Sequence, residues 1–154
     1  MTEIWFYHLQ RHPLEKVLPE LIEKSLARRW RVALQARTEE RLKSLDSWLW
    51  TFADESFLAH GRAGDADPEL QPVYLTTGTE NPNRAAIRFF VEGAEIGPAL
   101  AGDGARYARA MALFDGANAE ELAIARSQWK ELKEQGFALT YWQQREGGRW
   151  EKKA

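Results

Sequence analysis

Three basic side chains recur at helical spacing near the end of the chain. Arg126, Lys130 and Lys133 lie at i, i+4 and i+7 within a helix that the pattern predicts over residues 118–135, so they form one ridge. No acidic residue stands three or four places from Arg126, and like charges at that spacing repel one another. The ridge is therefore either a solvated face or a place for an anionic partner. A carboxylate would suit it, because Arg offers a planar fork and Lys a point charge.

An apolar stripe is predicted beside this ridge. It consists of Leu122, Ala125, Trp129 and Leu132, at i, i+3, i+7 and i+10. Asn118 is the expected N-cap, with Glu121 completing a capping box, and Gly136 is suited to end the helix.

Trp50 lies off the apolar face of an earlier helix, predicted over residues 38–52. A rotation of ~100° per residue places it away from the stripe formed by Leu42, Leu45, Leu49 and Phe52. It is either a packing residue at the entry to the next strand or an exposed anchor, a role in which Trp is enriched.

The histidines offer little catalytic machinery. His8 and His12 are four residues apart, but one ends a predicted strand and the other lies in a loop, so we interpret them as polar strand-end residues rather than metal ligands. His60 could pair with Asp54 or Glu55 as a catalytic dyad. A small-molecule hydrolase or transferase with His60 as base is therefore the alternative function.

A second alternative is direct binding of nucleic acid through Trp30 and its basic neighbours, Arg28, Arg29 and Arg31. The alternative interpretation is structural: basic residues at the end of a helix, followed directly by a strand, would give the same cluster. The net charge of −2, with −6 carried by residues 51–104, does not suit a broad nucleic-acid surface, so any basic site must be local.

The elements that position these residues predict one α/β domain over residues 1–142. Strand 4–9, a helix from 14 that Pro19 should kink or delay, strand 30–36 and helix 38–52 alternate with short connections. That order is typical of a three-layer, Rossmann-like, mostly parallel sheet with helices on both faces. Further strands are expected over 57–59, 73–76, 86–91 and 137–142. Residues 61–72 are expected to be a loop, 93–104 a loop or short helix, 107–114 either strand or helix, and 143–154 a polar, frayed tail.

Several classes are excluded by what the sequence lacks. It contains no Cys, so a thiolate nucleophile and a disulfide framework are excluded. The turn over residues 10–13 has no Gly, so it is neither a dinucleotide-binding nor a phosphate-binding loop. We therefore expect no cofactor and no metal. No apolar run approaches the ~20 residues of a membrane span, and the N-terminus does not resemble a signal peptide, so a cytoplasmic protein is the expectation.

Four stretches, taken in order, carry a family resemblance. They are FYHL at residues 6–9, RRWRV at 28–32, Leu49-Trp50 followed by Phe57 and His60, and Ala125-Arg126 followed by Trp129-Lys130 and Gly136-Phe137. From about Ile4 to Trp142 the chain resembles the chi subunit family of bacterial DNA polymerase III holoenzyme. Trp129 stands where that family usually has Tyr.

The resemblance implies a Rossmann-like fold without nucleotide and a non-catalytic accessory role in the clamp-loader assembly. It implies binding of the acidic C-terminal tail of single-stranded-DNA-binding protein by Arg126, Trp129 and Lys130, with Trp50 as an aromatic wall. To this set, the residue pattern adds Lys133 and Leu139. The resemblance further implies a psi-binding surface centred on Phe57, with His60 nearby, and contact with DNA mainly through partners.

Overall fold

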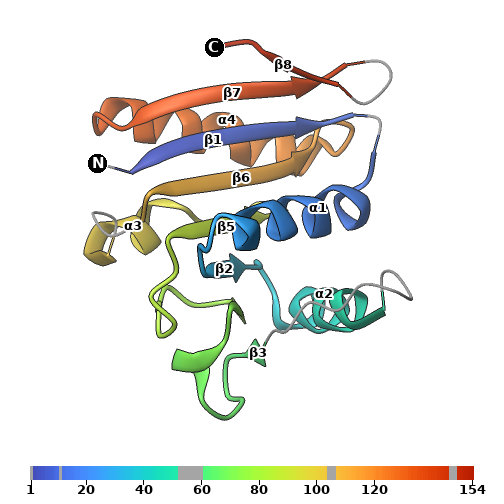
Figure 1. The fold of residues 1–154 in the computed structure, drawn as a ribbon. Coiled ribbons are helices and arrows are strands. Elements are labelled where there is room, and N and C mark those ends of the chain that lie inside the picture. Colours follow the sequence, from blue (N-terminus) through green and yellow to red (C-terminus); the bar gives the residue numbers. More distant parts are fainter. Residues whose placement is uncertain (1, 11, 52–60, 104–106, 146–148) are drawn as a thin grey trace.

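The strands of this protein form one mixed sheet in the computed structural model, which describes residues 2–10, 12–51, 61–103, 107–145 and 149–154 (Figure 1). The described elements are β1 (Glu3–Leu9), α1 (Leu14–Ala27), β2 (Val32–Gln35), α2 (Glu39–Thr51), β3 (Gly61–Arg62), a 3₁₀ turn η1 (Pro68–Leu70), β4 (Val73–Thr76), β5 (Ile87–Val91), α3 (Gly97–Asp103), β6 (Arg109–Asp115), α4 (Ala119–Glu134), β7 (Ala138–Gln144) and β8 (Trp150–Lys152).

The order of strands in the sheet is β3-β4-β2-β5-β6-β1-β7-β8. Every neighbouring pair is parallel except β7 and β8, which are antiparallel. The central strands β2, β4 and β5 are buried along their whole length, as strands covered on both faces must be. The predicted mostly parallel α/β fold is confirmed.

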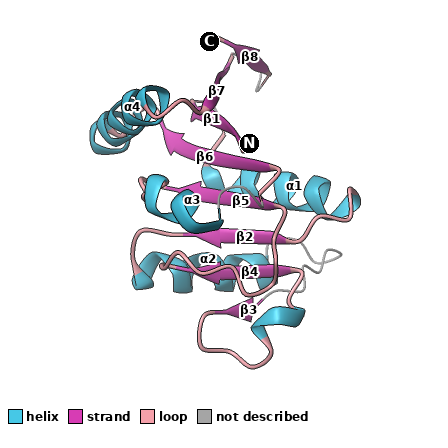
Figure 2. Cartoon of the chain, turned by 90° about the vertical axis from the view of Figure 1, so that its left-hand side faces the viewer, coloured by secondary structure: helices cyan, strands magenta, loops and turns pink. Residues whose placement is uncertain are grey.

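Two apolar clusters pack against the sheet, one with α1 and α2 and the other with α3 and α4. These two pairs of helices lie on opposite faces of the sheet (Figure 2). On one face, Leu18 and Ile22 of α1 pack with Leu45 of α2. On the other, Leu100 of α3 packs with Leu132 of α4. Because side chains alternate along a strand, β1 contributes to both clusters, with Ile4 and Phe6 on the α3–α4 face and Tyr7 and Leu9 on the α1–α2 face. The predicted three layers are therefore present.

A tryptophan on α2 supports the proline inside α1. The helix begins at Leu14 and runs through Pro19 to Ala27, so no late start occurs. Pro19 has no N–H for the carbonyl of Glu15 four residues earlier. Trp48 Nε1 donates to that carbonyl oxygen at 2.7 Å. The cost of proline is thereby reduced by a contact between the two helices.

A buried arginine holds the connection between β4 and β5. Arg88 is 0% exposed, and its guanidinium donates to Gln35 Oε1 at 2.8 and 3.0 Å. It also donates to the carbonyls of Gly78 and Glu80 at 2.7 and 2.9 Å. A buried charge requires such acceptors. The segment leading into β5 is consequently tied to the middle of the sheet.

The structure changes three expectations about the elements. Residues 107–114, for which strand and helix were both open, form β6, and the loop expected over 61–72 contains β3 and η1. The frayed tail expected over 143–154 is wrong for its described part, because β7 extends to Gln144 and β8 pairs with it. Trp150 of β8 stacks on Tyr7 at 4.5 Å, which gives the last strand an apolar anchor. The strand predicted over 57–59 lies outside the described residues.

Candidate functional site

The helix that carries the basic ridge begins as its sequence predicts. Asn118 Oδ1 accepts a hydrogen bond from the backbone N–H of Glu121 at 3.0 Å. In a complete capping box the Glu121 side chain would accept from the backbone N–H of Asn118. Here Glu121 Oε1 accepts instead from the N–H of Asp115 at 3.1 Å. Gly136, with φ of 89°, follows the C-terminal end of the helix, where a left-handed residue favours Gly.

The helix α4 has an apolar stripe against the sheet and a polar flank on each side of that stripe. Ala125 and Leu132 are buried, and Leu122 and Trp129 are partly buried against the same cluster, so the predicted apolar stripe is confirmed. The flank facing α3 is lined by Ile124, Ser127, Gln128, Glu131 and Gln135. The opposite flank, at about 60–120° around the helix from the apolar stripe, carries Arg126, Lys130 and Lys133.

Trp129 fills the angle between α4 and the sheet. Its ring meets Phe6 of β1 edge-on at 5.3 Å and Tyr141 of β7 edge-on at 5.7 Å. Leu139 of β7 packs against the same cluster and is partly buried. We call Arg126, Trp129, Lys130, Lys133, Leu139 and Tyr141 the α4–β7 surface. It combines an aromatic and aliphatic floor with cations on one side.

The cations of this surface are not neutralised within the described part of the chain. Arg126, Lys130 and Lys133 are exposed, and none of their side chains forms an ion pair or hydrogen bond with another described residue. Other cations do, as Arg41 does with Glu15 and Glu92 and Arg62 with Asp46. The ridge on α4 is thus left with positive charge directed to solvent.

Arg126 also influences a histidine and a tyrosine behind it. His8 Nδ1 and Tyr141 Oη lie 2.6 Å apart, joining β1 to β7. Burial lowers the pKa of His8, and the Arg126 charge lowers that pKa further, against an opposing effect of Asp115. Burial raises the pKa of Tyr141, and Arg126 opposes that rise. Arg126 therefore lies on the β1–β7 side of α4, close to Tyr141.

The helix α2, which carries Trp50, packs against α1 and β4, and the sheet separates α2 from α4 (Figure 2). The side chain of Trp50 lies outside the described residues, so its expected role as a wall beside Trp129 stays a prediction. Among the described residues, Tyr141 provides an aromatic contact to Trp129. His8 and Tyr141 were missed in the sequence because only the pairing of β1 with β7 brings them together.

The residues expected to contact psi, Phe57 and His60, lie outside the described residues, as do Asp54 and Glu55. Elsewhere in the described chain, no group of three His, Asp or Glu side chains could hold a metal ion, and no helix is both long and apolar enough to cross a membrane.

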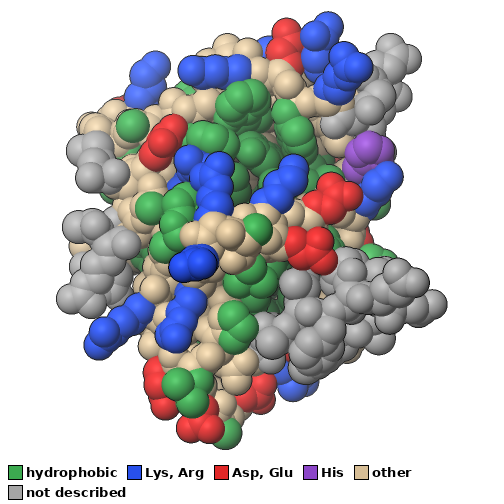
Figure 3. Space-filling model, viewed as in Figure 1, with side chains coloured by type: hydrophobic (Ala, Val, Ile, Leu, Met, Phe, Trp, Pro, Cys, Tyr) green, Lys and Arg blue, Asp and Glu red, His purple; other side chains and the backbone are tan. Residues whose placement is uncertain are grey.

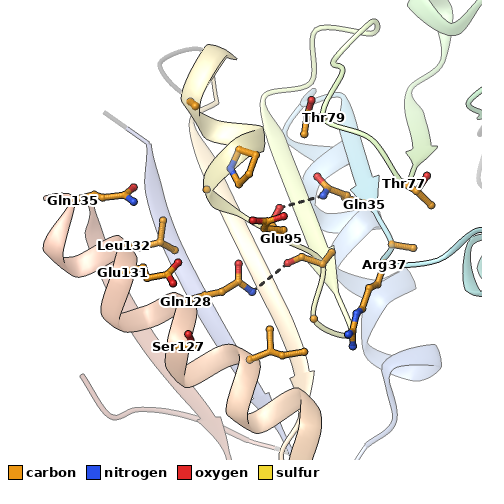
Figure 4. A pocket seen from close by; sticks show the side chains of 17 residues that line it. Gln35, Arg37, Thr77, Thr79, Glu95, Ser127, Gln128, Glu131, Leu132 and Gln135 are labelled. Atoms are coloured by element: carbon orange, nitrogen blue, oxygen red, sulfur yellow. Dashed lines mark hydrogen bonds between the residues drawn. The ribbon is translucent and has the colours of Figure 1, made fainter.

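Two large cavities lined by described residues lie away from the α4–β7 surface. The larger, of about 810 Å³, lies between α3, α4 and the carboxyl ends of β2 and β4 (Figure 4). Its amide side chains are engaged: Gln128 binds the N–H of Ile96 and the carbonyl of Ala94, and Gln35 donates to the carbonyl of Glu95. The second, of about 590 Å³, lies where β1 and β6 end and contains the Arg41 ion pairs.

The strands, helices and surfaces define a doubly wound α/β domain with a cationic, aromatic surface on one helix flank. Residues 1–140 match the sequence profile of the family described as DNA polymerase III chi subunit, HolC. The chain therefore belongs to the DNA polymerase III chi subunit family.

A curated relative points to the same family. It is the probable DNA polymerase III subunit chi of Rickettsia prowazekii (strain Madrid E), which is 27% identical over 100 residues, or 65% of this chain. The match spans 61% of that relative's length.

Proposed function

We propose that this chain is a DNA replication accessory protein that holds the acidic C-terminal tail of single-stranded-DNA-binding protein on its α4–β7 surface. Membership of the chi family supports the replication role. The observation that carries the binding site is the set of three exposed cations, without a counterion among the described residues, beside a partly buried Trp129.

The chemistry of such a tail matches the surface in two respects. A terminal carboxylate is suited to the Arg126 fork, and the acidic residues before it can meet Lys130 and Lys133. The apolar terminal side chain can rest on the floor of Trp129, Leu139 and Tyr141. This is C-terminal carboxylate capture, a recurring mode of peptide recognition. The small contact area sets the expected Kd on the order of micromolar.

In this proposal the chain performs no chemistry itself. It acts as a non-catalytic subunit of the polymerase complex, with psi or an equivalent clamp-loader component bound through the Phe57 and His60 region. The tail and the clamp loader would then be held by different parts of one small domain. Contact with DNA at the α4–β7 surface would be indirect, through the protein whose tail it binds.

The test is a titration of the full chain with a labelled acidic peptide that ends in Phe, followed by fluorescence anisotropy. We expect binding that weakens with salt, because exposed charge pairs are screened over about 8 Å at physiological ionic strength. A peptide lacking the last residue should bind poorly. Arg126→Glu should abolish binding, whereas Lys43→Glu, which makes the same charge change at an exposed site on α2, should not. Equal binding by both variants would rule out the α4–β7 surface.

A further inference from the structure

The other face of β1 and β7 carries a second aromatic surface. On this side α1 packs against β2 and β6, and no described helix covers β1, β7 and β8 (Figure 1). Trp5 of β1, Trp142 of β7, Trp150 of β8 and Trp30 before β2 are all partly buried at the edge of the same apolar cluster. We call these four residues the tryptophan face. Figure 3 shows hydrophobic side chains reaching the surface over β7 and β1, with Lys and Arg side chains around them.

The rings of this face form a chain of contacts interleaved with guanidinium groups. Trp5 and Trp142 lie 5.6 Å apart, and Trp150 is anchored by its stack on Tyr7. The guanidinium of Arg109 stands 3.9 Å from the ring of Trp5 and 5.6 Å from that of Trp30. Arg28 lies 5.3 Å from Trp30 on its other side. Trp5 Nε1 also donates to Glu3 Oε1 at 2.6 Å, so the cations and rings of this face lie beside one carboxylate.

Donors on this face lack acceptors. Arg109 forms no ion pair or hydrogen bond with another described residue, and its Nε is buried without a partner. The indole Nε1 of Trp142 is also buried without one. A charged donor held between two tryptophans usually has an acceptor, because an unmet buried donor costs stability. Those two buried atoms are out of a ligand's reach, but Arg109 as a whole is only partly buried, and its guanidinium between two indole rings points to a ligand that brings acceptors and flat apolar faces together.

Further cations border a groove between α1 and β8. The groove encloses about 270 Å³ and is lined by Lys16, Glu20, Lys24, Gln144 and Trp150 among others. Lys16 and Lys24 are exposed, and neither forms an ion pair with a described residue. Lys152 pairs in register with Trp142, so its side chain lies on the same side of the sheet as the tryptophan face. Glu20 is the acidic residue in the lining of this groove.

We infer that the tryptophan face binds single-stranded DNA directly. Unpaired bases can stack on partly exposed indole rings, and phosphates can meet Lys16, Lys24, Arg28 and Lys152. A duplex conceals its bases in the stack and would use the cations alone. A polypeptide partner could satisfy Arg109 with a carbonyl, as Gly78 and Glu80 do for Arg88, but it would not bring a regular row of anions to the surrounding cations. The observations therefore favour a single strand, bound separately from the tail that we place on the α4–β7 surface.

The salt dependence of binding provides a quantitative test. A fluorescein-labelled oligothymidylate of about twelve nucleotides should bind the full chain, and binding should quench tryptophan fluorescence. Each phosphate neutralised on a single strand contributes about −0.7 to the slope of log K against log salt. Four such contacts predict a roughly 50-fold loss of affinity between about 0.05 and 0.2 M salt. A duplex of the same length should bind more weakly at both salts.

Charge variants locate the site. The double variant Lys24→Glu and Arg28→Glu changes two exposed residues and should reduce affinity at least tenfold, while Lys43→Glu leaves it within about twofold. Arg126→Glu should spare DNA binding yet abolish peptide binding, which separates this inference from the proposed function. Trp150→Phe should retain more affinity than Trp150→Ala, and a thermal melt would confirm that each variant folds.

Four results would contradict the inference. The first is equal affinity of the Lys24→Glu/Arg28→Glu variant and the parent chain for the oligonucleotide. The second is binding of duplex as tightly as single strand. The third is absence of DNA binding together with a concentration-dependent dimer that Trp150→Ala dissociates, which would assign the tryptophan face to a second copy of the chain. An oligouridylate bound more tightly than its DNA counterpart would likewise contradict the choice of DNA.

Discussion

Replacing Arg126 by Gln should separate the charge of the α4–β7 surface from its shape. Gln keeps most of the aliphatic stem and a polar head but removes the cation and the fork. A hydrogen bond to a charged group contributes about 1.5–3 kcal/mol. Arg126 is exposed in the free chain but would be partly covered by a bound peptide. The expected rise in Kd for an acidic, Phe-terminated peptide is therefore roughly 10- to 150-fold.

The same substitution has a consequence that needs no ligand. Arg126 lowers the pKa of His8, so Arg126→Gln should raise that pKa toward its ordinary value. Burial, the larger cause of the depression, would remain. Histidine NMR titration of the parent and variant would measure the change, with Lys43→Gln as a control that leaves His8 untouched.

If Arg126 lies beside His8 and also meets the peptide, Arg126→Gln should change both the Kd of the peptide and the pKa of His8. An unchanged Kd with a shifted His8 pKa would show that Arg126 sits where the structure places it but does not meet the peptide. An unchanged pKa would refute the placement of Arg126 beside His8 and Tyr141. A bound carboxylate should itself raise the His8 pKa in the parent chain, because it offsets the Arg126 charge.

Three further predictions concern stability and pH. Trp129→Ala should cost about 2–4 kcal/mol of unfolding free energy in urea, because it empties a partly buried space between Phe6 and Tyr141, and should also weaken the peptide complex. Arg88→Met should cost about 3 kcal/mol or more in the same assay, since it leaves the carbonyls of Gly78 and Glu80 unpaired, and a smaller loss would mean that water reaches them. His8 has a folded pKa below 6.5, so the unfolded chain binds more protons between the two values. Stability should therefore fall as pH drops below about 6.5, and His8→Asn should flatten that part of the Tm profile.

Two neighbouring strands supply both candidate surfaces. Along β7, Leu139 and Tyr141 face α4, whereas Trp142 belongs to the tryptophan face. Along β1, Phe6 supports Trp129 and Trp5 contacts Trp142. This follows from the period of two along a strand, which sends adjacent residues to opposite sides of the sheet. One edge of an overall acidic protein can therefore present two local basic and aromatic surfaces.

The features that depend on local order in the chain could be predicted. The apolar stripe and basic ridge of α4, its Asn118 cap and the alternation of strands with helices all follow from periodicities of 3.6 and 2 residues. The fold class followed in turn, because strands and helices that alternate through short connections build a parallel sheet. These features need no knowledge of which distant residues meet.

The neighbours in the sheet were decided only by the tertiary structure. Placing β1 between β6 and β7 brings His8 to Tyr141, and the sheet separates α2 from α4. Because β8 pairs with β7, residues expected to form a frayed tail, such as Trp150, line a groove instead. The contacts of β1 with β6 and β7 join residues more than a hundred positions apart, and local spacing does not encode which strands become adjacent. The amino-acid sequence by itself therefore determined which side chains each element could offer, and long-range strand pairing determined which of them share a surface.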